Sequence, residues 1–113
     1  MPFIHISVTE KLSDDKKQRL ADAVGRCAPL LPGKQFEKTM VRVDDGCMIC
    51  RGGESASCAF ASTHVRRPNE LSDKTAFVEQ LYKVFEEQLG FEQAQCYFQI
   101  IESDEWGSRG SLH

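Results

Sequence analysis

Along this chain of 113 residues, stretches in which hydrophobic residues alternate with polar ones are separated by stretches in which they recur every three or four residues. β-Branched and aromatic residues alternate with more polar ones over residues 1–8, which predicts a short strand. Similar patterns predict three further strands, at residues 39–43, 57–65 and 95–101. A short extension is expected at residues 47–50, ahead of a glycine-rich turn.

Apolar residues recur at three- and four-residue spacings between these strands, which predicts two helices. The first is expected to begin after Ser13, a favourable N-cap, and to continue through Leu31 until Pro32-Gly33 stops it. The second is expected to begin at a Ser72-Asp73 cap and to end at Gly90. The predicted apolar faces are Leu20, Ala23, Val24, Cys27, Ala28 and Leu31 in the first helix, and Phe77, Leu81, Val84, Phe85 and Leu89 in the second.

This order of elements repeats once. The stretch Lys11-Leu12-Ser13-Asp14-Asp15-Lys16 recurs as Glu70-Leu71-Ser72-Asp73-Lys74, and each copy precedes a helix, a glycine, a phenylalanine and a strand. We therefore interpret residues 1–113 as a single domain made of two β-α-β units, at about 2–50 and 57–106.

A right-handed crossover makes the two strands of each unit parallel. Two units then predict an α+β fold, a four-stranded mixed sheet with both helices on one face. The other face would be bare and apolar, so packing alone predicts that the chain oligomerises.

Composition narrows the classes of function. The net charge of −3 and the pI of about 5.6 give no reason to expect binding to nucleic acid or to an anionic membrane. No apolar run approaches the ~20 residues of a membrane span, and we recognise no signal peptide before the first strand. The odd number of cysteines is therefore expected to be free thiols in the reducing cytosol; they are Cys27, Cys47, Cys50, Cys58 and Cys96.

Two sets of residues of types that often bind metals or take part in catalysis are assigned no functional role. Cys47 and Cys50 have the C-x-x-C spacing of zinc and redox sites, but no second pair accompanies them and they do not open a helix. We therefore expect neither a metal nor another cofactor. His5 and His64 lie within predicted strands and are expected to be satisfied by hydrogen bonds rather than to be catalytic.

Pro2 is the candidate for catalysis. Initiator methionine is usually removed before proline, which would leave Pro2 as a secondary amine at the first residue of a strand, where proline is tolerated. A free α-amino group titrates at about 8, and burial disfavours its charged form. Such an amine could act as a general base near neutral pH. The alternative is that Pro2 does no more than permit methionine removal.

Several short motifs follow one another along the chain: Pro2-Phe3-Ile4, Gly33-Lys34, Gly52-Gly53 followed by Cys58-Ala59, Ser62-Thr63-His64, Tyr97 and Trp106. In this order and at this spacing, they give the chain a resemblance to the tautomerase superfamily. It is most similar to the branch of macrophage migration inhibitory factor (MIF) and phenylpyruvate tautomerase. Members of the superfamily begin with a catalytic amino-terminal proline and form trimers of β-α-β repeats.

The resemblance implies roles for three residues. Pro2 would be the general base that moves a proton between carbon and oxygen of an enolisable substrate. Lys34 would lie beside the proline and attract a substrate carboxylate, and Tyr97 would come from the neighbouring subunit. An ordinary solvated loop lysine and a half-buried strand aromatic are the alternatives for Lys34 and Tyr97.

The chain also departs from the pattern of this branch. Arg66 stands where the family has an active-site isoleucine, and Gln99 where it has an asparagine. Arg42 is placed like the carboxylate-binding arginine of the oxalocrotonate-type tautomerases, and Arg66-Arg67-Pro68 resembles the malonate semialdehyde decarboxylase group. Arginines around one proline suggest a more anionic substrate, such as a dicarboxylate. The alternative is that they are surface charges or interface ion pairs.

We therefore expect a cytoplasmic, cofactor-free homotrimer that tautomerises a small anionic 2-keto acid. Pro2 would be the catalytic residue, and Lys34, Arg42, Arg66, Tyr97 and Gln99 would bind the substrate. No nucleic acid, membrane or metal is expected to take part. Two alternatives stay open: a decarboxylase or hydratase of the same superfamily that uses protonated Pro2, and a non-catalytic MIF-like binding or signalling protein.

Overall fold

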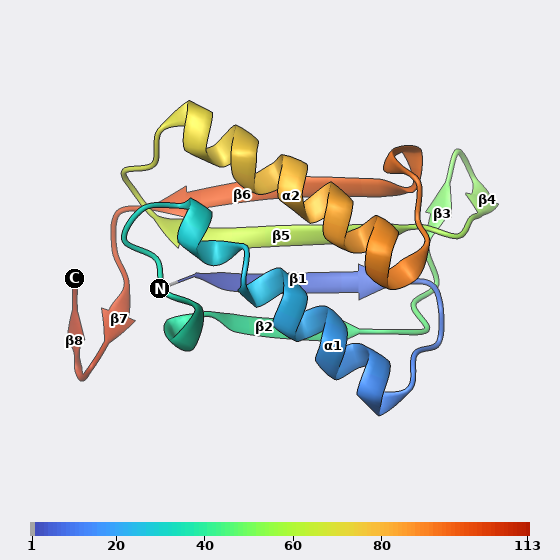
Figure 1. The fold of residues 1–113 in the computed structure, drawn as a ribbon, viewed down its shortest axis with the longest axis horizontal. Helices are drawn as coiled ribbons and strands as arrows, with labels where there is room; N and C mark the ends of the chain where they lie inside the picture. The colour runs from blue at the N-terminus through green and yellow to red at the C-terminus, as the bar shows by residue number, and fades with distance from the viewer. Residues whose placement is uncertain (1) are drawn as a thin grey trace.

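The computed structural model of the protein describes residues 2–113, in which the longest strands form one four-stranded sheet (Figure 1). These strands are β1 (Phe3–Val8), β2 (Met40–Asp44), β5 (Ala59–Arg66) and β6 (Cys96–Ser103), in the order β2-β1-β5-β6. β1 runs parallel to β2 and β5 runs parallel to β6, whereas β1 and β5 are antiparallel. The predicted mixed sheet, with parallel strands inside each β-α-β unit, is confirmed.

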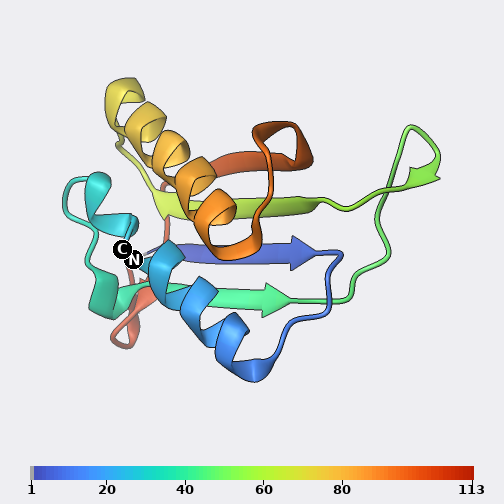
Figure 2. The ribbon, with the colours of Figure 1, turned by 45° about the vertical axis from the view of Figure 1, so that its right-hand side comes forward.

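The helices α1 (Asp14–Gly25) and α2 (Leu71–Leu89) lie across the same face of this sheet, as the two views in Figures 1 and 2 show. Period-2 alternation decides which strand residues meet them. Ile4, Ile6 and Val8 of β1 are fully buried beneath the helices, while the residues between them are partly exposed. Within residues 2–113, neither helix has the length and hydropathy needed to cross a membrane.

The first helix ends earlier than its apolar pattern predicts. Ser13 is the N-cap, as predicted, and its hydroxyl accepts a hydrogen bond of 3.1 Å from the Lys16 amide. The helix stops at Gly25, however, and a separate 3₁₀ turn, η1 (Ala28–Leu30), follows it. Pro29 explains the difference, because it has no N–H to donate and its ring would collide with the carbonyl group four residues earlier.

The second helix begins earlier than predicted. Its N-cap is Glu70, so Ser72 and Asp73 lie within the first turn and do not cap it. The Lys74 amide donates a hydrogen bond to the Glu70 carbonyl at 3.0 Å, so the first helical turn begins at Glu70, two residues before the predicted cap. The predicted end at Gly90 is confirmed, and this glycine adopts the left-handed φ of 69° that commonly terminates helices.

Two short hairpins and two further 3₁₀ turns complete the described residues. The expected strand at residues 47–50 is wrong except at Cys50, which begins a hairpin of β3 (Cys50–Arg51) and β4 (Glu54–Ser55). This hairpin extends away from the sheet (Figure 2). The second hairpin, β7 (Gly107–Ser108) and β8 (Ser111–Leu112), was not predicted and lies beyond the end of the sheet where β1 begins (Figure 1). The turns are η2 (Phe36–Lys38) and η3 (Gln93–Gln95).

The sheet face away from the helices, which we call the open face, carries rows of side chains set by the strand register. One row is Met40, Phe3, His64 and Ile101; the next is Arg42, His5, Ser62 and Gln99; the next is Asp44, Ser7, Phe60 and Tyr97. The outer rows expose large apolar side chains, among them Met40, Phe60 and Tyr97, as the bare-face prediction requires. The middle row is polar, so the open face is less apolar than the sequence pattern suggested.

Candidate functional site

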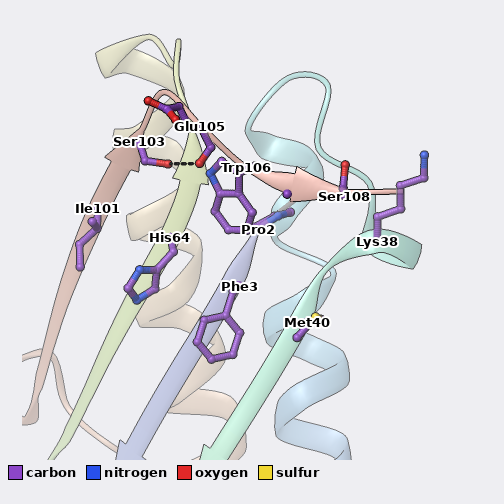
Figure 3. A pocket seen from close by; sticks show the side chains of 11 residues that line it. Pro2, Phe3, Lys38, Met40, His64, Ile101, Ser103, Glu105, Trp106 and Ser108 are labelled. Atoms are coloured by element: carbon purple, nitrogen blue, oxygen red, sulfur yellow. Dashed lines mark hydrogen bonds between the residues drawn. The ribbon is translucent and has the colours of Figure 1, made fainter. Parts of the chain in front are cut away.

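Pro2 lies at the wall of a cavity of about 620 Å³, which we call the Pro2 cavity (Figure 3). Pro2 is buried and extends the pairing of β1 with β2, because its carbonyl accepts a hydrogen bond of 3.1 Å from the Met40 amide. Most of the wall is apolar. It includes Phe3, Met40, Ile101 and Trp106, with Lys38, His64, Ser103, Glu105 and Ser108 as polar members.

Strand directions explain why residues so far apart in sequence meet here. Because β1 and β2 are parallel, both begin at this edge of the sheet, and Phe3 lies beside Met40. Because β1 and β5 are antiparallel, the end of β5 lies at the same edge, and His64 is opposite Phe3. β6 runs with β5 and delivers Ile101, and the chain beyond it contributes Trp106.

The histidines on the open face are hydrogen-bonded, as predicted. His5 Nε2 lies 2.7 Å from Asp44 Oδ2, and His64 Nε2 lies 3.1 Å from Ser62 Oγ. The hydrogen bond from His5, and more weakly that from Arg42, holds the pKa of Asp44 below its usual value. The His64 ring also packs against Phe3, with centroids 5.6 Å apart, and so lines the Pro2 cavity, a position that sequence reasoning did not assign to it.

Of the cations proposed from the sequence, none lies in the described wall of the Pro2 cavity. Lys34 is in the loop after η1, and the lysine of the wall is instead Lys38, four residues later. Arg42 is exposed on the open face, where its Nε donates to Asp44 Oδ1 at 3.2 Å. Arg66 is exposed at the end of β5, paired in register with Ser103 of the wall.

Tyr97 and Gln99 also lie away from the Pro2 cavity of their own chain. Both are exposed on the open face of β6, at the positions paired with Phe60 and Ser62. The Tyr97 side chain is 61% exposed, and the guanidinium carbon of Arg51 lies 5.8 Å from its ring centre. Within one chain the structure therefore does not bring Pro2 together with these two residues.

Lys38 could have been found from the sequence with one further step. It immediately precedes the Thr39-Met40 start of the second strand, and parallel pairing places the starts of β1 and β2 side by side. Glu105 and Ser108 gave no such signal, because the tail after the last strand carries no periodic pattern from which its path could be predicted.

A polar network holds the segment that forms one wall of the cavity. The Glu102 carboxylate accepts hydrogen bonds from Lys74 Nζ at 2.7 Å and from Asn69 Nδ2 at 2.9 Å. The Arg67 backbone amide donates a hydrogen bond to the Ser103 carbonyl at 2.9 Å, and Arg67 Nη2 donates to the Glu102 carbonyl at 3.1 Å. The bond from Lys74, followed by that from Asn69, lowers the pKa of Glu102 below its ordinary value of 4.5.

A scan against models of protein families finds no match, and a search of curated proteins finds no relative by sequence. Solved structures do resemble the protein in fold. MIF2 of Leishmania major has a TM-score of 0.88 and 20% sequence identity, and the match covers 100% of this chain and 97% of that one. A wild-type fused 4-OT, an asymmetric trimer, has a TM-score of 0.85 and 16% identity, covering 96% and 94%.

Pt0534, in a structure inactivated by 2-oxo-3-pentynoate, has a TM-score of 0.81 and 17% identity, covering 89% of this chain and 85% of that one. The chain therefore has the fold shared by MIF and 4-OT structures, and the resemblance stated from the sequence is confirmed at the level of fold.

The Glu102 network makes a prediction for acid stability. Because the pKa of Glu102 is lowered by folding, its contribution to stability is complete above its ordinary value of 4.5 and is lost as the pH falls through the lower folded value. We expect Glu102→Gln to lower the free energy of unfolding at about pH 7 and to lose this difference towards about pH 3, measured by urea unfolding. Glu87→Gln, at an exposed position of α2, is the matched control. A difference from wild type that stays constant with pH would contradict the assignment.

Proposed function

We propose that the protein is a cofactor-independent keto–enol tautomerase that acts on a small 2-keto acid, with Pro2 as general base. One observation carries the proposal: Pro2 is buried immediately before β1, in the wall of a mostly apolar cavity. The chemistry requires that Met1 be removed, since an acylated proline nitrogen has no basic lone pair. Met1 lies outside the described residues 2–113.

In the proposed reaction, the neutral amine of Pro2 takes a proton from the carbon next to the substrate carbonyl. The C–H bond breaks, its electron pair forms the carbon–carbon double bond of an enolate, and the carbonyl oxygen gains the negative charge. The ammonium of Pro2 then returns the proton to oxygen or to another carbon. An apolar wall favours the uncharged amine at the start of this cycle, because burial disfavours the charged form.

Cationic groups would hold the substrate carboxylate and steady the enolate. Lys38 is the lysine of the described cavity wall and is our first candidate. Lys34, Arg42 and Arg66 are proposed as further contacts made from outside that wall. An arginine would hold a carboxylate in a bidentate way that a lysine cannot.

We further propose that the protein is a homotrimer whose neighbouring subunit completes each active site with Tyr97 and Gln99. Two observations support this: both residues lie on the exposed open face, and the fused 4-OT with the same fold is a trimer. We also propose a cytoplasmic location, where free cysteines are ordinary.

Replacing the base should remove most of the activity. We expect Pro2→Ala to lower kcat/KM for phenylpyruvate or 2-hydroxymuconate tautomerisation by about 10²–10⁴-fold, the usual contribution of a general base. Intact mass spectrometry establishes first that Met1 is absent from both proteins. Pro32→Ala, at an exposed loop proline, is the control and should retain wild-type rates. Equal rates for wild type and Pro2→Ala would overturn the proposed function.

A shared active site should allow two inactive variants to rescue one another. Sedimentation should give three times the 12.7 kDa mass of the chain. Pro2→Ala and Tyr97→Ala homotrimers should each have low activity, whereas mixed trimers should recover activity at sites that combine an intact Pro2 with an intact Tyr97. A monomeric protein, or mixed trimers no more active than the separate variants, would contradict the shared site.

A further inference from the structure

The β3–β4 hairpin contacts the start of β6 through Arg51, beside a residue of the proposed shared site. The guanidinium carbon of Arg51, in β3, lies 5.8 Å from the ring centre of Tyr97, in β6. The same guanidinium donates a hydrogen bond through Nη1 to the carbonyl of Ala94, in the η3 turn just before β6. We call these three residues the Arg51 clamp.

The chemistry of arginine allows both contacts of the clamp at once. Its guanidinium is planar and has several N–H donors, so one edge can donate to a carbonyl while the charged group lies near an aromatic ring. The face of a tyrosine ring attracts a cation within about 6 Å. A carboxylate would compete for the guanidinium, but Arg51 takes part in none of the ion pairs found among residues 2–113. Even Glu54, opposite Arg51 in the hairpin register, does not pair with it.

The turn that carries Ala94 is itself held, so the clamp has a fixed support. Within this turn, the Glu92 amide donates to Gln95 Oε1 at 2.7 Å. Gln95 Nε2 in turn donates to the carbonyl of Ser57, just after β4, at 3.1 Å. The hairpin is therefore tied to the start of β6 on both sides, by Arg51 in β3 and by Ser57 beyond β4.

Tyr97 needs such a support if it is to act in a neighbouring subunit. Its side chain is 61% exposed on the open face, and an exposed side chain ordinarily samples several rotamers. A side chain that is ordered before it meets its partner binds at a lower entropic cost. Orientation matters for the reaction as well, because a small displacement of a group that positions the substrate can lower the rate strongly.

The clamp lies far from the Pro2 cavity of its own chain. Tyr97 is in register with Phe60, and Phe60 is in register with Ser7. Ser7 is five residues along the chain from Pro2, a separation of roughly 16 Å at about 3.3 Å per residue. Figure 1 shows the β3–β4 hairpin and the start of β1 at opposite ends of the sheet. The clamp can therefore act only on the cavity of another copy of the chain.

We propose that Arg51 is a positioning residue of the shared active site. It holds the Tyr97 ring in the orientation in which the Pro2 cavity of the neighbouring subunit receives it, and it is assigned no contact with substrate. This inference rests on the proposed function for the role of Tyr97, but the contact between the two side chains can be measured without any turnover.

Ring-current shifts in the NMR spectrum test the contact itself, because protons above an aromatic ring resonate upfield. We expect the Arg51 side-chain protons of the wild-type protein to resonate upfield of those of Arg19, an exposed arginine of α1. They should return to ordinary positions in Tyr97→Leu, which keeps an apolar side chain and removes the ring. Arg51 resonances at ordinary positions in the wild type, or unmoved by Tyr97→Leu, would overturn the proposal.

Activity measurements test what the contact does. We expect Arg51→Gln to lower kcat/KM for 2-hydroxymuconate tautomerisation about tenfold, because the Tyr97 ring loses its support. Arg51→Lys should retain part of the activity, since it keeps a cation near the ring without the planar fork. Arg19→Gln, which removes one exposed positive charge from α1, should have wild-type rates. Wild-type rates in Arg51→Gln, or an equal loss in Arg19→Gln, would overturn the proposal.

Mixed trimers separate a loss at Tyr97 from a general structural defect. Trimers of Arg51→Gln with Pro2→Ala should recover activity, at sites that combine an intact Pro2 with a Tyr97 held by an intact Arg51. Trimers of Arg51→Gln with Tyr97→Ala should be no more active than the average of the separate variants, because every Tyr97 position is then defective. Recovery in the second mixture, or none in the first, would overturn the proposal.

The inference and the proposed function fail separately. If Pro2→Ala keeps full turnover, the proposed function fails, and the ring-current shifts still decide whether Arg51 holds Tyr97. If Pro2→Ala is inactive while Arg51→Gln complements Tyr97→Ala, the proposed function stands and the role of Arg51 is overturned.

Discussion

The antiparallel pairing of β1 with β5 is the contact on which the rest of the structure depends. It joins the two β-α-β units, and its register fixes which side chains share a face. With Phe3 opposite His64, the residues Ile4 and Ile6 face the helices and are fully buried. A slip of one residue would move this whole apolar set to the open face.

The same pairing creates the candidate site. It brings the start of β1 to the edge where β5 and β6 end, so that the first residue of the fold meets the segment after its last long strand. Proline is tolerated at this position, immediately before β1, where a ladder hydrogen bond from its nitrogen is not required. Trp106 and Ser108 form part of the cavity wall, in the segment that runs from the Glu102 network into the β7–β8 hairpin.

Much of this arrangement can be predicted from the sequence, and the exceptions have physical causes. Strand positions and their pairing follow from alternation and from the repeated β-α-β pattern. The end of α1 was misplaced because the buried pattern continues through Cys27 and Leu31 although Pro29 forbids a continuous α-helix. Apolar spacing reports burial, and it does not distinguish a helix from a helix followed by a 3₁₀ turn.

The site was predictable at Pro2 and less so around it. Lys38 could have been placed from the parallel pairing of β1 with β2, whereas the position of Ser108 depends on a short hairpin in a polar tail, which no periodic pattern reveals. Tyr97 and Gln99 are a different case. Their exposure on the open face follows from alternation, but their proposed meeting with Pro2 requires another copy of the chain.

The central claim is that Pro2 presents a free, uncharged secondary amine to its cavity at neutral pH. Nitrogen NMR of protein labelled with ¹⁵N-proline measures this directly, since an amide, a protonated amine and a neutral amine differ in chemical shift. The account predicts that the Pro2 signal is that of a neutral amine at pH 7 and becomes protonated on acidification. An amide signal, or an amine still fully protonated at pH 7, would contradict it.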